Sequence, residues 1–181
     1  MMKSPIFCTI FCLILLGSCA KEEVEVPPCD NCTFDCVDSS HVDVITNDCL
    51  PNWMCSFYFT NDSRVETDAY YGVAEGDKRV FQMVSDTEGE DWIADDEFTN
   101  ILVFEIDPEQ TSFSAEDAAL KDLRVLYKSI CYCSEVMFRE ISSGCMQGIE
   151  QPDGSWHVQG AVVVPYEYLD IQVNFDAIFI E

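Results

Sequence analysis

Positively charged side chains are scarce in this chain. Nine lysines and arginines stand against 34 aspartates and glutamates, and the formal net charge is −25 at pH 7. A charge of this sign repels the phosphate backbones of nucleic acids and the anionic head groups of lipid surfaces. We therefore expect no nucleic-acid partner, and an acidic surface that keeps the protein soluble.

Histidines and catalytic motifs are also few. The sequence holds two histidines, His41 and His157, and contains no G-x-S-x-G elbow, H-E-x-x-H pair, phosphate loop or dinucleotide fingerprint. His157 falls on the polar side of an expected strand, where we expect it to face solvent. Nucleophilic catalysis therefore lacks its parts, and we expect neither an enzyme nor a cofactor. Because carboxylate pairs are abundant, a hydrolase that works through such a pair stays open as an alternative.

A long apolar run occurs only at the N-terminus. Residues 1–18 place Lys3 before an apolar stretch that reaches Leu16, and small residues follow it. This is the layout of a secretory signal peptide. The stretch is shorter than the roughly 20 residues of a membrane-spanning helix. We therefore expect residues 1–18 to be a signal peptide.

The end of this segment carries a recognisable motif. Leu16-Gly17-Ser18-Cys19 resembles the lipobox of bacterial lipoproteins. The resemblance implies cleavage before Cys19 and lipidation of Cys19, which would anchor the protein to a membrane through several acyl chains.

The residues after the lipobox suggest on which side the protein lies. Lys21-Glu22-Glu23 resembles the surface-export tag of lipoproteins from the Bacteroidota, which implies an outer-membrane protein that faces the cell surface. The alternative is that these residues are simply part of a solvated tether. That tether would span residues 19–28, stiffened at its end by Pro27-Pro28.

The cysteines agree with export. Cys8 and Cys12 lie in the signal segment, Cys19 would carry lipid, and the remaining cysteines are Cys29, Cys32, Cys36, Cys49, Cys55, Cys131, Cys133 and Cys145. In an oxidising compartment they favour disulfides over zinc thiolates, with 105 possible connectivities. Odd numbers lie before residue 56 and after residue 130. If all are paired, at least one bridge must therefore join the N-terminal region to the C-terminal half.

An acidic segment at residues 86–97 is a candidate calcium loop. It holds seven carboxylates in twelve residues, and acids at its positions 1, 3, 5 and 12 match the ligand spacing of an EF-hand. Its glycine stands at position 4 instead of 6, and no helices are expected to flank it. A solvated acidic hairpin loop is the competing interpretation, and Trp92 within it is expected to anchor the loop to the domain.

Alternating apolar and polar residues predict a mainly β domain over residues 29–181. Residues 98–106 are apolar on both faces, which is typical of a central strand. Residues 136–141 are expected to form an antiparallel meander with the two strands that follow them. Together the strand candidates predict an antiparallel β-sandwich or open barrel, and they lie at residues 41–46, 55–60, 79–85, 98–106, 136–141, 156–164 and 169–179.

One helix is expected, at about residues 114–130. Ser114 is placed to cap it, and Asp117 is placed to reach back to the cap. Apolar residues then recur at helical spacing along one face, at Ala115, Ala118, Ala119, Leu123, Leu126, Tyr127 and Ile130.

The C-terminal third carries a second resemblance. From Gly144 onward, a glycine-spaced strand, an Asp153-Gly154 turn, a strand led by Trp156 and a final alternating strand look like the C-terminal pattern of small uncharacterised Bacteroidota lipoproteins. The resemblance implies no activity. We expect a lipid-anchored, exported and non-catalytic binding or structural module, with a calcium-stabilised adhesion domain as the first alternative. Its expected partner is a glycan, a peptide or an outer-membrane transporter complex.

Overall fold

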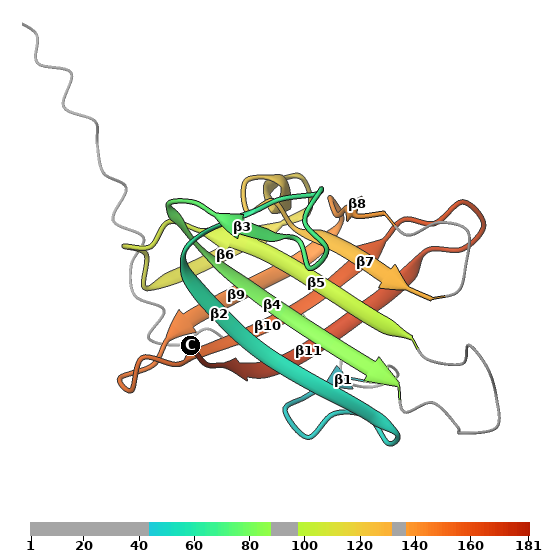
Figure 1. The fold of residues 1–181 in the computed structure, drawn as a ribbon, viewed down its shortest axis with the longest axis horizontal. Coiled ribbons are helices and arrows are strands. Elements are labelled where there is room, and N and C mark those ends of the chain that lie inside the picture. Colours follow the sequence, from blue (N-terminus) through green and yellow to red (C-terminus); the bar gives the residue numbers. More distant parts are fainter. Residues whose placement is uncertain (1–43, 88–97, 132–136) are drawn as a thin grey trace, which may run out of the picture.

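Two facing β-sheets form the structure, a computed structural model that describes residues 44–87, 98–131 and 137–181 (Figure 1). In these residues one sheet has five strands, in the order β1 (Val44–Ile45), β11 (Ile171–Phe179), β10 (Trp156–Val164), β9 (Gly144–Glu150) and β6 (Ser112–Glu116). The other has six, in the order β3 (Val73–Glu75), β2 (Trp53–Val65), β4 (Lys78–Thr87), β5 (Thr99–Ile106), β7 (Leu126–Ile130) and β8 (Arg139–Glu140). The predicted mainly β, antiparallel fold is confirmed.

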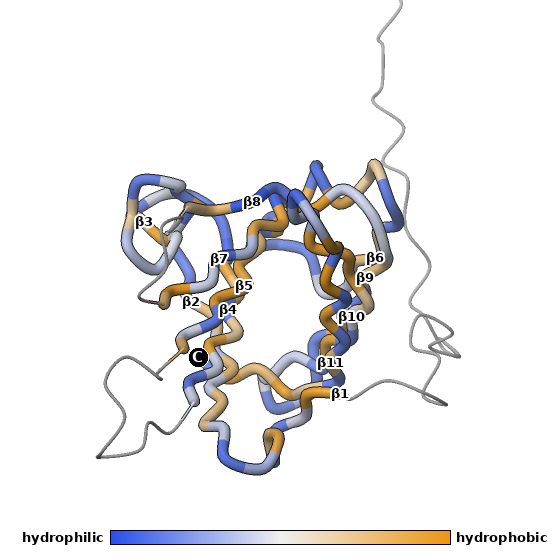
Figure 2. The backbone as a smooth tube through the Cα atoms, turned by 90° about the vertical axis from the view of Figure 1, so that its right-hand side faces the viewer, coloured by the Kyte–Doolittle hydropathy of each residue, from blue (hydrophilic) through white to orange (hydrophobic). Residues whose placement is uncertain are grey.

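The core lies between the two sheets and is largely aromatic. Phe81 on β4 stacks on Phe104 of β5, with ring centroids 4.7 Å apart and planes within 2°. The Phe81 ring also contacts Trp156 of β10 and Phe179 of β11. Its centroid lies 5.2 Å and 5.7 Å from theirs, both in edge-on geometry. Seen from the side, the sheets form two opposed walls (Figure 2). The alternation in each long strand therefore places every second residue in this shared interior.

The six-stranded sheet also carries an apolar cluster on its outer face. Val80 and Val84 of β4 pack there with Ile101 and Val103 of β5, and a loop at residues 66–72 covers part of them. The loop is held down by two buried polar side chains. Gln82 donates to the carbonyl of Tyr71, and Lys128 donates to the carbonyl of Tyr70. Because β5 is buried on both faces and lies between β4 and β7, the predicted central strand at 98–106 is confirmed.

The prediction of one long helix at about residues 114–130 is wrong. The segment instead contains the end of β6, one 3₁₀ helix η1 (Asp117–Lys121) and strand β7. Ser114 pairs with Gln147 of β9 instead of capping a helix, and Asp117 accepts a hydrogen bond from the Gly144 amide. Both ends of this segment find backbone partners in strands, residues 114–116 in β9 and residues 126–130 in β5, and such tertiary pairing overrides a weak helical preference.

The meander expected from residue 136 onward is also corrected in one part. β9, β10 and β11 are consecutive antiparallel neighbours, as predicted. The described part of 136–141 is β8, and it pairs with β7 in the other sheet. After β8 the chain crosses to the other sheet, where β9 begins at Gly144 with φ +109°, and a Cβ atom there would lie 2.2 Å from the carbonyl oxygen of Ala161. Glycine at this position thus permits the chain to change sheets.

The two sheets are joined along one side. The Phe59 amide donates to the Ile180 carbonyl at 2.9 Å, and the Ile180 amide donates to the Phe57 carbonyl at 3.3 Å. Next to this contact, the Asn47 side chain makes two hydrogen bonds with the backbone of Ile178, as a neighbouring strand would. The sandwich is therefore closed between β2 and β11. No helix in the described ranges is long and apolar enough to cross a membrane.

We expect Phe81→Ala to lower the free energy of unfolding by about 3–5 kcal/mol, because it leaves a cavity among rings from both sheets. Tyr168→Ala is the control, since that side chain is 91% exposed, and it should change the stability by less than about 0.5 kcal/mol. Denaturant unfolding followed by tryptophan fluorescence measures both. Equal effects of the two substitutions would contradict a core centred on Phe81.

Candidate functional site

Most of the sequence-predicted site residues lie outside the described residues. These are the signal-cleavage residues, the lipidation site, the export tag and half of the predicted disulfide cysteines, namely Leu16, Gly17, Ser18, Cys19, Lys21, Glu22, Glu23, Cys29, Cys32, Cys36 and Cys133. Their roles stay predictions.

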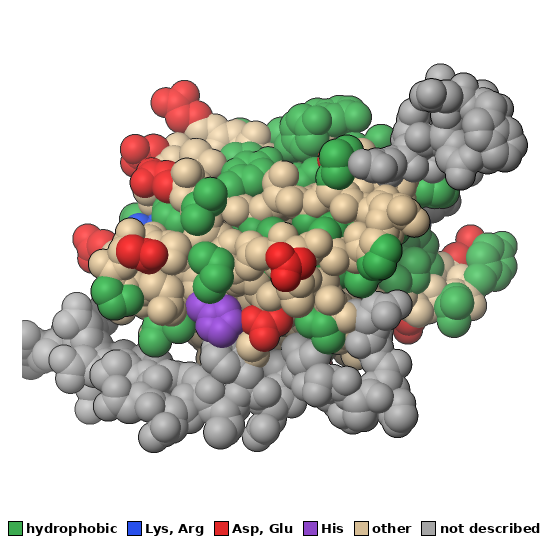
Figure 3. All heavy atoms as spheres, turned by 90° about the horizontal axis from the view of Figure 1, so that it is seen from below, with side chains coloured by type: hydrophobic (Ala, Val, Ile, Leu, Met, Phe, Trp, Pro, Cys, Tyr) green, Lys and Arg blue, Asp and Glu red, His purple; other side chains and the backbone are tan. Residues whose placement is uncertain are grey.

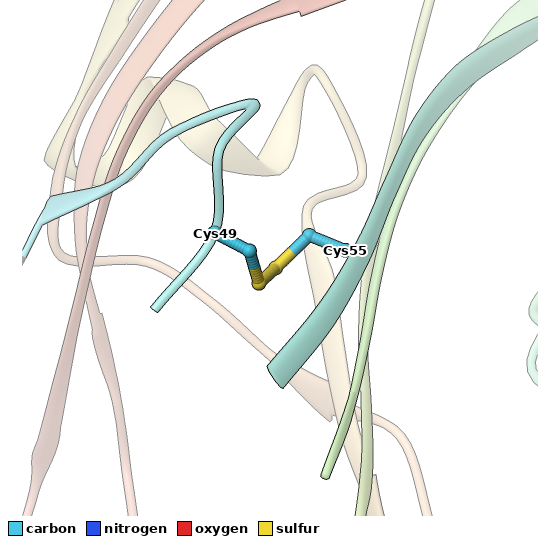
Figure 4. Close-up of a disulfide and its surroundings, with 2 residues drawn as sticks. All are labelled: Cys49 and Cys55. Carbon is cyan, nitrogen blue, oxygen red and sulfur yellow. A yellow bond between two sulfur atoms is a disulfide. The ribbon is translucent and has the colours of Figure 1, made fainter. Parts of the chain in front are cut away.

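The other predicted cysteines form disulfides. Cys49 and Cys55 are bonded to each other, with Cα atoms 5.6 Å apart (Figure 4). Cys131 and Cys145 each take part in a disulfide as well. Cys49 lies in the loop between β1 and β2, and Cys55 lies near the start of β2. This bond therefore ties the loop to the strand that follows it.

The acidic segment 86–97 is described only at its start. Asp86, at the end of β4, accepts a 2.6 Å hydrogen bond from the Thr99 hydroxyl of β5. Residues 88–97, including Trp92, lie outside the described residues, so the calcium hypothesis stays a prediction. Elsewhere in the described chain, no group of three or more histidine, cysteine, aspartate or glutamate side chains is arranged to hold a metal ion.

His157 lies on the outer face of the five-stranded sheet. Its Nε2 is 2.6 Å from Asp176 Oδ1, and the Gln159 amide donates to the second oxygen of the same carboxylate. These bonds connect β10 to β11. His157 is half-buried rather than fully solvent-facing, so the expectation for it is only partly met.

A cavity of about 260 Å³ opens between the sheets at one end of the sandwich. Its walls come from β1 with the β1–β2 loop and from the ends of β2, β4, β5, β7 and β11 that meet at this end. Seven apolar or aromatic side chains line it: Ile45, Leu50, Trp53, Met83, Tyr127, Ile171 and Val173. Cavities between sheets and at the mouths of barrels are common positions for small-molecule sites. This cavity is the strongest candidate site in the described chain.

The polar residues that line the cavity all have neutral side chains. They are Ser85 of β4, Asn100 of β5, and Gln172 and Asn174 of β11. Burial raises the pKa of the Tyr127 phenol, and the nearby Tyr166 adds to the effect, so this lining group stays uncharged. None of the described lining residues is acidic, basic or a histidine. By contrast, carboxylates are scattered over the face of the molecule seen in Figure 3.

One lining residue, Asn174, points its side chain away from the interior. It alternates on β11 with Val173 and Phe175, which belong to the core between the sheets, so it shares the outer face with Asp176. Its Oδ1 accepts a hydrogen bond from the Gln172 amide at 3.1 Å on that face. The side chains of Ser85 and Asn100, which alternate in step with the core residues Met83 and Leu102, are therefore the polar groups directed toward the cavity.

The Cys49–Cys55 disulfide lies between this cavity and an outer groove. Both cysteines line the cavity, and Cys55 also lines the groove. The groove, of about 460 Å³, lies over the contact between β2 and β11 and is lined among others by Tyr58, Ile178 and Ile180. The disulfide loop is thus a shared wall, and its position affects the shape of both spaces.

Comparisons with protein-family models, with curated proteins and with solved structures find no match to this chain.

The sequence did not predict this cavity. Its lining comes from six separate segments, and no motif joins them. One available signal was Ser85 and Asn100, polar residues near the ends of two predicted strands, which the structure places directly opposite each other. No feature of the sequence indicated that the described lining of the cavity would be neutral.

We expect the double substitution Cys49→Ala/Cys55→Ala to lower the free energy of unfolding by about 2 kcal/mol, as a closed loop of this length predicts. Thermal or denaturant unfolding of the two proteins under oxidising conditions measures the difference. The unsubstituted protein should lose the same stability when this disulfide is reduced. A double variant as stable as the parent would contradict a stabilising role for the bond.

A second expectation concerns the remaining cysteines. With Cys49 bonded to Cys55, three cysteines at residues 29–36 and three at residues 131–145 are left for pairing. If all six are paired, an odd number of bridges must join the two groups. Proteolysis without reduction, followed by mass spectrometry, should therefore recover a disulfide-linked peptide pair from these regions. Recovery of free thiols in both groups would contradict complete pairing.

Proposed function

We propose that this protein is an exported, lipid-anchored and non-catalytic binding module of the cell envelope, and that its ligand site is the cavity between the sheets. The observation that carries the binding assignment is the apolar, uncharged lining of this cavity. Burial of an apolar group there gains roughly 25 cal/mol per Å² of surface removed from water. The rigid sheets on both sides supply a preformed site, which reduces the entropy lost on binding.

Export and lipidation are supported from two sides. The lipobox-like segment ends at Cys19, and four cysteines of the described part are disulfide-bonded. Disulfides persist in oxidising compartments outside the cytoplasm. In this proposal, the acyl chains of Cys19 hold the module at the outer membrane, and residues 19–28 connect the anchor to the domain. The cavity then faces the cell surface or the periplasm.

A binding role agrees with the chemistry of the cavity better than a hydrolytic one. A hydrolase that uses a carboxylate pair needs two convergent acids beside its substrate. The described residues that line the cavity supply hydroxyl, amide and phenol groups, and these bind and orient without transferring protons at neutral pH. A transporter or receptor of the outer membrane is the class of partner to which such a module would deliver its ligand.

The lipid anchor has a direct test. We expect Cys19→Ala to abolish incorporation of labelled fatty acid and to leave the signal segment uncleaved. Cys12→Ala is the matched control, because it removes a cysteine within the expected signal peptide and should label normally. The measurement is metabolic labelling with a palmitate analogue, followed by mass spectrometry of the mature N-terminus. Labelling that persists in Cys19→Ala would contradict the assigned anchor and cleavage site.

A further inference from the structure

The size of the cavity limits what it can hold. An engineered cavity of about 150 Å³ in another protein binds benzene. The cavity here is larger, at about 260 Å³. It therefore has room for a ligand larger than one aromatic ring, such as two fused rings or a ring with a short substituent, but not for an oligosaccharide or a folded peptide element.

The walls favour a flat, apolar group. Trp53 lies on the β2 side, and the buried Tyr127 lies on β7. Aromatic pairs gain about 0.5–1.5 kcal/mol beyond the burial of their area. Met83, also buried, adds a thioether that adapts its shape and interacts favourably with ring edges. An aromatic ligand makes the best use of these three walls.

The electrostatic setting selects a neutral ligand. An anion would find no cation among the described lining residues, in a chain whose net charge is −25. A cation would find no carboxylate among them, so it would lose its hydration without a counter-charge. Tyr127 does not change this result, because its raised pKa keeps the phenol protonated. Charge of either sign is therefore disfavoured inside the cavity.

The polar groups specify a limited pattern of hydrogen bonds. Ser85 and Asn100 are cross-strand neighbours on β4 and β5, and they lie on the same face as the core residues Met83 and Leu102. A ligand with one hydroxyl or carbonyl oxygen could accept from the Ser85 hydroxyl or the Asn100 amide while its ring remains among the apolar side chains.

From these observations we infer that the cavity binds a neutral aromatic small molecule of about two fused rings that carries one or two uncharged hydrogen-bonding groups. This inference rests on the proposed function, because it names the ligand class of the same site. It separates a ring-binding module from one that takes up sugars, phosphates or metal ions.

The test is a set of three probes that share one naphthalene ring system and differ in the charge of their substituent. The full-length lipoprotein in nanodiscs is titrated with 2-naphthol, 2-naphthoate and 2-naphthylmethylammonium at pH 7, and binding to empty nanodiscs is subtracted. We expect 2-naphthol to bind one molecule per chain, at least about tenfold more tightly than either charged probe. Calorimetry measures affinity and stoichiometry together.

Three variants connect binding to the cavity. Met83→Trp fills the interior wall and should abolish binding of 2-naphthol, provided that its melting curve shows a folded protein. Ile171→Lys changes a lining residue that is 43% exposed and lies on the same face of β11 as the core residue Val173, so it should fold normally and shift the preference toward 2-naphthoate by about tenfold. Tyr168→Ala alters an exposed side chain outside the cavity lining and should bind like the parent.

Each outcome decides a different point. Equal or tighter binding of a charged probe, lost in Met83→Trp, overturns the ligand class and leaves the cavity as the binding site. Absence of binding by every probe, or an unchanged affinity in both Met83→Trp and Ile171→Lys, overturns the cavity as the site. The lipid anchor is tested separately through Cys19, so its success or failure is distinguishable from both results.

Discussion

The packing of Phe81 between the two sheets is the contact on which the rest of the structure depends. Its ring meets Phe104 within its own sheet and Trp156 and Phe179 from the facing sheet. A slip of one residue in the pairing of β4 would turn Phe81 to the outside and remove all of these contacts. The aromatic cluster therefore fixes the strand register of both sheets as well as the distance between them.

The inner face of β4 explains why the two ends of the sandwich differ. Arg79, near the start of the strand, lies 5.3 Å from the ring centroids of both Phe59 and Trp156, and its Nε donates to the Asn61 side chain. This long side chain fills its end of the interior. At the other end of the same face stand Met83 and the small Ser85, and there the cavity opens. A change from a large to a small side chain along one strand thus places the cavity at one end.

The long strands were predictable from sequence because each contributes many residues to one pattern. The alternation in β10 and β11 and the apolar run of β5 stay recognisable even where a single residue departs from the pattern. The short strands β1, β3 and β8 hold two or three residues, too few for any period. The helix predicted at residues 114–130 was wrong for another reason. Their apolar spacing fits a helical face, but Ala115 and Tyr127 are equally well buried on strands that gain backbone partners from β9 and β5.

The cavity could not be predicted from the sequence, because its distinguishing property is the absence of charged side chains from its described lining. In a chain with 34 acidic residues, its described lining is neutral, although those residues come from six segments that meet only after folding. A charged side chain loses its hydration when it is buried, which costs free energy, so neutral side chains alone would be expected of any core. A core is also filled, however, and its polar groups are paired. This space is not filled, and Ser85 and Asn100 stand side by side in its wall. The combination of neutral walls, open volume and a pair of neutral polar groups is what distinguishes a ligand site from an imperfectly packed interior.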